Sequence, residues 1–265
     1  PPASAGRQRG GTAAMRPLGR FADWLRPLAD RFRRFPPDFE PAEIEDIRAV
    51  QPYTMTTPER LVALIRAVHY LMDHDIPGDF VECGVWKGGS MMAIARTLRR
   101  RRACERHLWL FDTFTGMPPP TAADVSLRDE PAERLLRTHP SLRCEADLAS
   151  VRAAVLATGY PAELVHFVVG RVEETIPAQA PSRIALLRLD TDWYESTRHE
   201  LEHLFPRVVH GGVLLVDDYG HWRGARRAVD EYLQTHRVPL LLNRIDYSAR
   251  IGVKLGGPTL GAEPC

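Results

Sequence analysis

Five short apolar segments alternate with helical patterns along the chain, and this alternation constrains the fold most. The segments lie at residues 79–84, 107–112, 164–170, 184–190 and 212–217. Apolar runs of this length are typical of parallel strands that are buried on both faces. Helical patterns separate or follow them at 88–101, 145–158, 195–205 and 223–235. The alternation predicts an α/β fold with a doubly wound, mostly parallel sheet.

The chain divides into a variable N-terminal segment, residues 1–50, and one domain at residues 51–265. The N-terminal segment begins with small and polar residues, which predict no fixed structure, and has an amphipathic helical pattern from Phe21. We expect that helix to serve as a lid or an oligomerisation contact, with a membrane-surface helix as the alternative. The domain is expected to begin with a helix at 58–72, capped by Thr57 and with proline at its first position.

The composition excludes several kinds of partner. The formal net charge is +1, so the chain lacks the basic excess that binding to a nucleic-acid backbone requires. It has no apolar run long enough to cross a bilayer and no secretory signal, so we expect a cytoplasmic protein without membrane contact. The four cysteines show neither zinc-site spacing nor disulfide density, which favours free thiols.

Acidic residues gather at the ends of the predicted strands. In a doubly wound sheet, ligands bind beyond the carboxyl ends of the strands, where the strand order reverses. Six carboxylates lie at or just beyond such an end: Glu82, Asp112, Asp190, Asp192, Asp217 and Asp218. Acidic residues that served only as a solvated surface would be scattered along the chain. We therefore expect a ligand site that is built from these side chains.

The segment from Glu82 to Ser90 joins the first strand to a helix through a glycine-rich turn. A dinucleotide-binding turn needs a glycine where Trp86 stands, so that the backbone can approach a pyrophosphate. A Walker loop needs lysine directly before serine or threonine, whereas two glycines separate Lys87 from Ser90. S-adenosylmethionine has no phosphate, and a glycine turn with bulky neighbours suits it. The turn therefore favours S-adenosylmethionine over NAD and ATP.

Two further strand ends could hold the adenosine part of that cofactor. Asp112 ends the second strand, where a carboxylate can accept hydrogen bonds from both ribose hydroxyls. Gly170 and Arg171 follow the third strand, where an adenine ring could lie against the backbone and Val172. Together with the glycine turn, these residues predict a cofactor pocket.

Four aspartates after the last two strands predict a cation site. Asp190 and Asp192 are two residues apart, so both side chains are expected on one side of the strand and Thr191 on the other. Asp217 and Asp218 are neighbours and converge only if the chain turns there. Four clustered carboxylates raise each other's pKa values unless a cation or an arginine neutralises them. Oxygen ligands favour magnesium or calcium over zinc. The alternative is that Asp190 or Asp217 caps a helix and the others are solvated.

One motif matches the sequence pattern of a zinc protease site. His199 and His203 flank Glu200 with the spacing of two zinc ligands one helical turn apart. No third ligand follows at a recognisable spacing. Leu201 and Leu204 indicate the buried face of this helix, which leaves both histidines partly exposed. We interpret the motif as an ordinary helix surface.

Three segments together resemble the macrocin O-methyltransferase family. They are residues 78–90, 187–197 and 211–220, with the sequences GDFVECGVWKGGS, LRLDTDWYEST and GGVLLVDDYG. The resemblance runs from about Thr54 to Tyr232. At two positions the chain departs from the family pattern: Trp193 replaces a leucine-like residue, and no aromatic residue follows Gly170.

The resemblance implies a Rossmann-like fold of the class I methyltransferase type and an enzyme that acts as a homodimer or higher homo-oligomer. It implies a magnesium-dependent transfer of methyl from S-adenosylmethionine to a sugar or related hydroxyl of a small natural product such as an antibiotic. It suggests Asp190, Asp217 and Asp218 as metal ligands and Asp192 as the general base. The candidate cofactor-binding residues are Thr56, Glu82, Gly84, Trp86, Ser90, Asp112, Asp147, Gly170, Arg171 and Val172.

A neutral sugar hydroxyl is a poor nucleophile and must lose its proton as it attacks the methyl carbon. Magnesium on two neighbouring hydroxyls, a vicinal diol, would fix the acceptor and favour its alkoxide. Asp192 would take the proton, and His221 is the next candidate. A catechol or other phenol could chelate the metal in the same way and is the alternative acceptor. The alternative outside enzymes is a catalytically silent partner subunit that binds the cofactor.

Overall fold

A seven-stranded sheet forms the centre of the molecule. The computed structural model describes residues 35–256, and residues 40–256 belong to one compact unit. The strands have the order β3-β2-β1-β4-β5-β7-β6. Their bounds are β1 Asp79–Cys83, β2 Leu108–Asp112, β3 Val165–Val169, β4 Ile184–Leu189, β5 Val208–Val216, β6 Asn243–Arg244 and β7 Arg250–Val253.

The first five strands are parallel, and β7 and β6 add an antiparallel edge beyond β5. The strand order reverses between β1 and β4, so this pair forms the switch point of the sheet. All six residues of β4 are buried, as expected of a central strand covered on both faces. The predicted doubly wound, mostly parallel sheet is confirmed.

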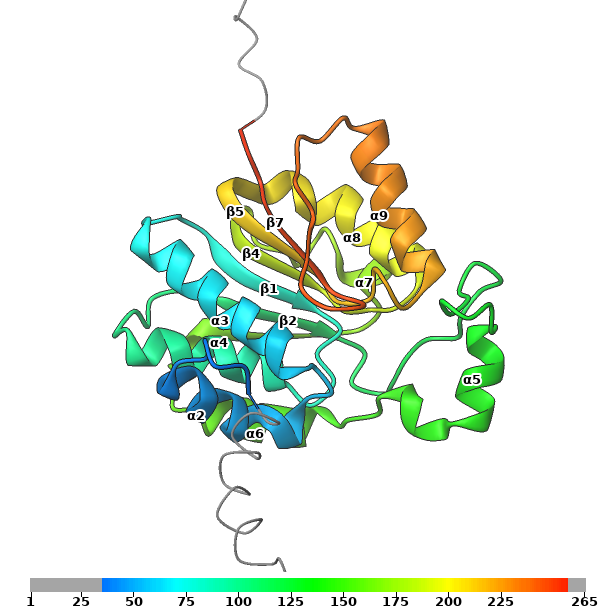
Figure 1. Ribbon diagram of the computed structural model, residues 1–265. Helices are drawn as coiled ribbons and strands as arrows, with labels where there is room; N and C mark the ends of the chain where they lie inside the picture. Colours follow the sequence, from blue (N-terminus) through cyan, green and yellow to red (C-terminus); the bar gives the residue numbers. More distant parts are fainter. Residues whose placement is uncertain (1–34, 257–265) are drawn as a thin grey trace, which may run out of the picture. The chain divides into compact units, whose positions relative to one another are not determined.

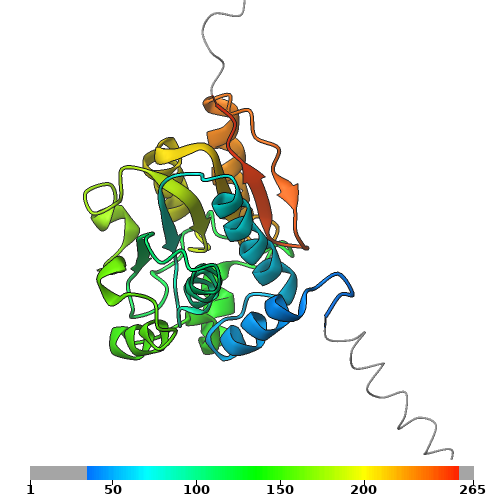
Figure 2. The ribbon, with the colours of Figure 1, turned by 90° about the vertical axis from the view of Figure 1, so that its left-hand side faces the viewer.

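Helices cover both faces of the sheet (Figure 1). The set α2, α3, α4 and α6 packs together on one face, and α7, α8 and α9 pack on the other. Figure 2 shows two helices of the first set, α2 in blue and α3 in cyan, next to each other. The bounds are α2 Pro41–Val50, α3 Pro58–Asp73, α4 Gly89–Arg100, α5 Ala132–Thr138, α6 Leu148–Leu156, α7 Val172–Thr175, α8 Tyr194–Leu204 and α9 Arg223–Thr235, with 3₁₀ turns at Gln51–Tyr53, Pro140–Arg143, Ala162–Leu164 and Phe205–Arg207.

The start of α3 follows from its sequence. The Thr57 side chain accepts a hydrogen bond from the Arg60 amide, and proline occupies the first helical position, as predicted. Three helices were not expected: α2, α5 and the one-turn helix α7, which follows β3. Of these, α2 packs against α4, where Arg96 and Arg100 donate to Asp46 at 2.8 and 2.9 Å. The compact unit therefore begins at the start of α2, within the range assigned to the N-terminal segment.

The second unexpected helix, α5, lies in the long connection between β2 and α6 and stands apart from both helical layers in Figure 1. The amphipathic pattern that begins at Phe21 lies outside the described residues. None of the helices between residues 35 and 256 is long and apolar enough to cross a membrane.

Candidate active site

A cavity of about 320 Å³ lies at the carboxyl ends of the parallel strands. Its wall unites the glycine turn after β1 with the aspartates after β4 and β5. Nearly all the predicted site residues line it: Thr56, Glu82, Gly84, Trp86, Ser90, Asp112, Gly170, Arg171, Val172, Asp190, Asp192, Asp217 and Asp218. Asp147 does not. It caps α6 by accepting the Ser150 amide at 3.0 Å and lines a separate hollow.

The glycine turn presses directly against the aspartate-bearing loop. Gly84 has a φ of 81°, and a Cβ there would lie 2.0 Å from the carbonyl oxygen of Asp190. Only glycine fits this position. Asp112 holds the turn from the other side, since its Oδ2 accepts the amides of Val85 and Trp86 at 2.7 and 2.9 Å. Asp112 therefore organises the turn, while its contact with a ribose stays a prediction.

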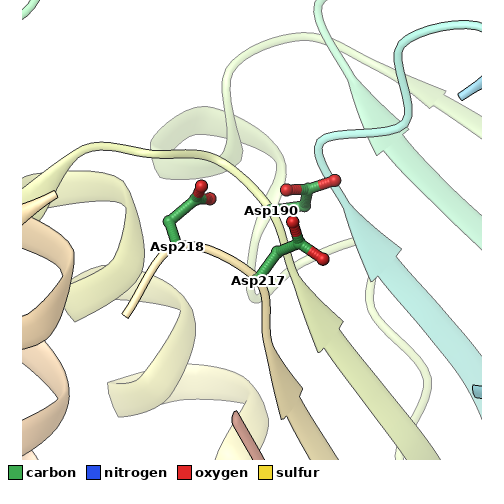
Figure 3. A group of neighbouring side chains, drawn as sticks. All are labelled: Asp190, Asp217 and Asp218. Carbon is green, nitrogen blue, oxygen red and sulfur yellow. The ribbon is translucent and has the colours of Figure 1, made fainter. Parts of the chain in front are cut away.

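Three carboxylates converge beyond the strand ends (Figure 3). Asp190, Asp217 and Asp218 each offer an oxygen atom, and these atoms lie within 4.8 Å of one another. Asp190 follows β4, whereas the other two follow β5, where the chain bends directly after Val216. This bend is the turn that the sequence analysis required if the neighbouring side chains of Asp217 and Asp218 were to converge. One oxygen of Asp218, Oδ2, is buried without a hydrogen-bond partner.

Two arginines neutralise part of this charge. Arg188 of β4 is buried and donates to Glu82 at 2.5 Å, to Asp190 at 2.6 Å and to Asp217 at 2.6 Å. Arg60 of α3 donates to Asp217 from the opposite side. Sequence reasoning missed both residues. A signal existed for Arg188, because it is the only charged residue in a strand that is otherwise apolar, and a buried charge requires partners.

Glu82 is the carboxylate that Arg188 contacts beside the glycine turn. Its Oε1 accepts from Arg188, but its Oε2 is buried and has no hydrogen-bond partner among residues 35–256. Burial raises the pKa of Glu82 to about 8, although Arg188 opposes this shift. A buried carboxylate oxygen without a partner fits a cationic or hydrogen-bond-donating ligand.

Asp192 lies in a tight turn, not on a continued strand. It has a φ of 65°, and the Trp193 amide donates to the Thr191 carbonyl at 2.7 Å, which closes a γ-turn. Asp190 and Asp192 line one cavity, as expected, but Thr191 lines it as well; strand alternation does not direct Asp192 at the cavity, because β4 already ends at Leu189. The turn aims it there instead. Such a backbone conformation costs about 1–3 kcal/mol.

The Asp192 side chain has a different type of partner from its neighbours. The indole Nε1 of Trp222 donates to its Oδ1 at 2.5 Å. Burial, and then the nearby charge of Asp190, raise the pKa of Asp192. Burial likewise raises the pKa of Asp218. A site of this kind has more negative charge than its own arginines balance.

The rest of the cavity wall comes from loops that the sequence did not flag. Apolar side chains from residues 55 and 117–142 form one part of it: Met55, Met117, Pro118, Leu135, Leu136 and Leu142. His221, Trp222 and Tyr247 form another part. Burial, and then the charge of Arg60, lower the pKa of His221. The wall therefore combines apolar and aromatic surfaces beside the carboxylates.

Comparison with known proteins decides the family. Residues 37–251 match the family model described as macrocin-O-methyltransferase (TylF). The chain belongs to the macrocin O-methyltransferase family. This O-methyltransferase is 34% identical over 195 residues to the 8-demethyl-8-(2,3-dimethoxy-alpha-L-rhamnosyl)-tetracenomycin-C 4'-O-methyltransferase of Streptomyces olivaceus. The match covers 73% of this chain and 72% of that protein.

Solved structures agree with the family. The O-methyltransferase NovP superimposes on this O-methyltransferase with a TM-score of 0.69 and 30% identity, over 77% of this chain and 83% of NovP. The SAH-bound methyltransferase PaMTH1 of Podospora anserina has a TM-score of 0.53 at 12% identity, over 93% of this chain and all of PaMTH1, and shares the fold alone. The fold is thus the S-adenosylmethionine-binding class I methyltransferase fold.

The zinc-protease-like motif of this O-methyltransferase forms no metal site. The rings of His199 and His203 lie 4.4 Å apart, and His199 Nε2 contacts the carbonyl of Ile176 at 3.0 Å. Between residues 35 and 256, the aspartate cluster is the only group of three side chains placed to hold an ion. Glu200, in the middle of the motif, is fully buried.

Proposed function

We propose that this O-methyltransferase transfers the methyl group of S-adenosylmethionine to a hydroxyl of a sugar on a natural product, with Mg²⁺ as a second cofactor. One observation carries the proposal: the glycine turn and the aspartate cluster line a single cavity. A donor at the turn and an acceptor at the aspartates would therefore meet. The name of the tetracenomycin relative describes methylation of a rhamnosyl group, which supports a sugar acceptor.

The cofactor side of the cavity suits S-adenosylmethionine. We assign the cationic amino group of its methionine end to Glu82, whose buried Oε2 has no hydrogen-bond partner in the described part of the chain. The turn at Gly84 and Trp86 would lie along the cofactor, and Gly170 and Val172 would contact its adenine. The sulfonium group makes the methyl carbon electrophilic.

The acceptor side suits a hard divalent cation. Carboxylate oxygens are the ligands that Mg²⁺ prefers, and Asp190, Asp217 and Asp218 bring theirs within 4.8 Å of one another. Mg²⁺ held there would act as a Lewis acid toward two neighbouring acceptor hydroxyls. Arg188 and Arg60 keep Asp190 and Asp217 in place and reduce their repulsion.

The remaining steps belong to side chains of the protein. The acceptor oxygen forms its bond to the methyl carbon as the carbon–sulfur bond breaks, and sulfur keeps the electron pair. Asp192 accepts the hydroxyl proton, while the Trp222 indole holds one of its oxygens at 2.5 Å and leaves the other for the acceptor. Apolar side chains such as Met117 and Leu135 exclude water. Orientation of this kind contributes about 7–11 kcal/mol in favourable systems.

A panel of acceptors tests the proposal. The protein is incubated with methyl-labelled S-adenosylmethionine, Mg²⁺ and one of three compounds: a deoxysugar glycoside with a vicinal diol, the same glycoside with its diol blocked, or a catechol. We expect labelled product from the free diol only. Asp218→Asn is the matched control, because it should retain cofactor binding but lose transfer.

Two results would contradict this function. Transfer to the catechol alone would replace the sugar by a phenol as the acceptor class. Tight binding of the cofactor, with no transfer to any acceptor of a broad panel, would favour a silent partner subunit.

A further inference from the structure

Three different elements hold the turn that carries Asp192. The Asp192 carboxylate accepts from Trp222, as described above. The Trp193 indole donates to the Pro118 carbonyl at 2.9 Å, which ties the turn to the connection after β2. The Thr191 hydroxyl donates to Glu200 of α8 at 3.1 Å. A left-handed non-glycine residue persists only where its surroundings over-determine it, so each of these contacts bears on Asp192.

Of the three contacts, the one from Glu200 reaches the turn from the interior. Glu200 has no exposed surface, and it does not line the cavity, whereas Thr191 does. Its Oε2 accepts from the Thr191 hydroxyl, and its Oε1 has no nitrogen or oxygen donor among the described residues. The thiol of Cys83 on β1 is a further hydrogen-bonding neighbour. Of these two contacts only Thr191 lines the cavity, so Glu200 reaches the cavity wall through Thr191.

If Glu200 served only to fill space, an apolar side chain would give a more stable fold at this position. The charged groups that face it, Glu173 and Asp190, are both acidic, and no cation pairs with it among the described residues. Burial is the largest effect on Glu200 and raises its pKa well above the usual range. A buried acidic group without a cationic partner destabilises a fold relative to an apolar residue of the same size.

We infer that Glu200 is a positioning residue for the methyl-transfer reaction: its hydrogen bond to the Thr191 hydroxyl fixes the turn that aims Asp192 at the acceptor. The inference rests on the proposed role of Asp192 as base. It gives the glutamate of the zinc-protease-like motif a role that does not involve metal. Glu200 and Thr191 form one unit, so removal of either partner should have the same effect.

The test compares two substitutions at one position. Glu200→Leu removes the acceptor at similar size, whereas the carbonyl oxygen of Glu200→Gln can still accept from Thr191. We expect kcat of the leucine variant to fall about 10- to 100-fold, because small misplacements of reacting groups have effects of this order. Its cofactor affinity should not change, and its melting temperature should be equal or higher. The glutamine variant should recover most of the rate. Glu202→Leu, an exposed change on the same helix, is the control.

A double-mutant cycle with Thr191→Val separates positioning from general packing. The valine keeps the shape of threonine without its hydroxyl, so its kcat should fall as in Glu200→Leu, and the double variant should lose no more than either single variant. Additive losses would overturn the inference. A leucine variant with wild-type kcat, or equal losses in the leucine and glutamine variants with a falling melting temperature, would overturn it too.

A wild-type protein that transfers methyl to no acceptor would refute the proposed function, and the inference would then be decided by crystallography. In Glu200→Leu we expect Asp192 to leave its left-handed conformation and its contact with Trp222. An unchanged turn would overturn the inference regardless of activity.

Discussion

Asp192 accepts a hydrogen bond from an indole, whereas Asp190 and Asp217 accept from guanidinium groups. The guanidinium groups fix the positions of these two carboxylates, which we propose as metal ligands. The indole is a neutral donor, and burial together with the charge of Asp190 raises the pKa of Asp192, which favours uptake of a proton. This difference separates two of the proposed ligands, Asp190 and Asp217, from the proposed base, whereas the third ligand, Asp218, has no arginine partner among residues 35–256.

Substitution of Asp192 tests that separation. Asp192→Asn keeps the size and one acceptor oxygen but cannot take a proton, so kcat should fall on the order of 10²–10⁴-fold. Affinities for Mg²⁺ and cofactor, measured by calorimetry, should stay close to wild type. The deficit should shrink as pH rises, because more of the acceptor ionises unaided. If Mg²⁺ affinity fell in step with kcat, Asp192 would be a ligand, and His221 would become the candidate base.

Arg188 is the residue on which the metal-free site depends most. Arg188→Met leaves Glu82, Asp190 and Asp217 without their shared cation in a buried site. Breaking a buried ion pair from one side typically destabilises a protein by about 3–5 kcal/mol. We expect a loss of this size in the free energy of unfolding, measured with urea in metal-free buffer. The exposed Arg198→Met, which breaks surface pairs only, should change it by less than about 0.5 kcal/mol. Equal effects of both substitutions would contradict this account of Arg188.

The turn between β1 and α4 is the element that joins the cofactor side to the metal side. Gly84→Ala would force a Cβ against the Asp190 carbonyl, which cannot move without disturbing β4. Overpacking of this kind typically costs about 1–3 kcal/mol, and the positive φ adds to it. We expect a lower melting temperature together with weaker binding of both cofactor and Mg²⁺. Gly256→Ala, whose Cβ would meet only the His210 side chain at 3.3 Å, should be close to neutral.

Elements with a strong pattern were predictable from the sequence, and short or irregular ones were not. Each of the five parallel strands was expected within a few residues of its observed bounds, because parallel strands in a covered sheet are mostly continuous apolar runs. The edge strand β6 has two exposed residues and carries no such signal. The connection after β2 has no periodicity that would reveal α5. Since this connection supplies most of the apolar wall, that part of the cavity was less predictable than the strand ends.

Among the site residues, the acidic side chains at the strand ends were predictable from the sequence, but the residues that position them were not. Strand-terminal aspartates stand out because a buried strand precedes them. Arg60 and Glu200 lie on amphipathic helices among other charged residues, where a buried side chain looks the same in sequence as a solvated one. Their roles depend on contacts with residues far along the chain.

At the scale of the whole molecule, the sheet brings the proposed cofactor-binding turn next to the proposed metal-binding aspartates. Because β1 and β4 are neighbours at the switch point of the sheet, the turn after β1 and the aspartates after β4 meet without any large loop to bring them together. Arg188 spans the two sides through Glu82 and Asp190. This arrangement supports the central proposal, that methyl transfer takes place in one cavity and requires a divalent cation at the aspartates.

The most direct test of that claim is a single-turnover methyl-transfer assay with the divalent cation controlled. Cofactor-loaded protein is mixed with the diol glycoside in excess chelator, and Mg²⁺ is then added back. We predict no measurable transfer in chelator and full recovery with Mg²⁺, while binding of S-adenosylhomocysteine stays the same in both conditions. Undiminished transfer in excess chelator would contradict the account.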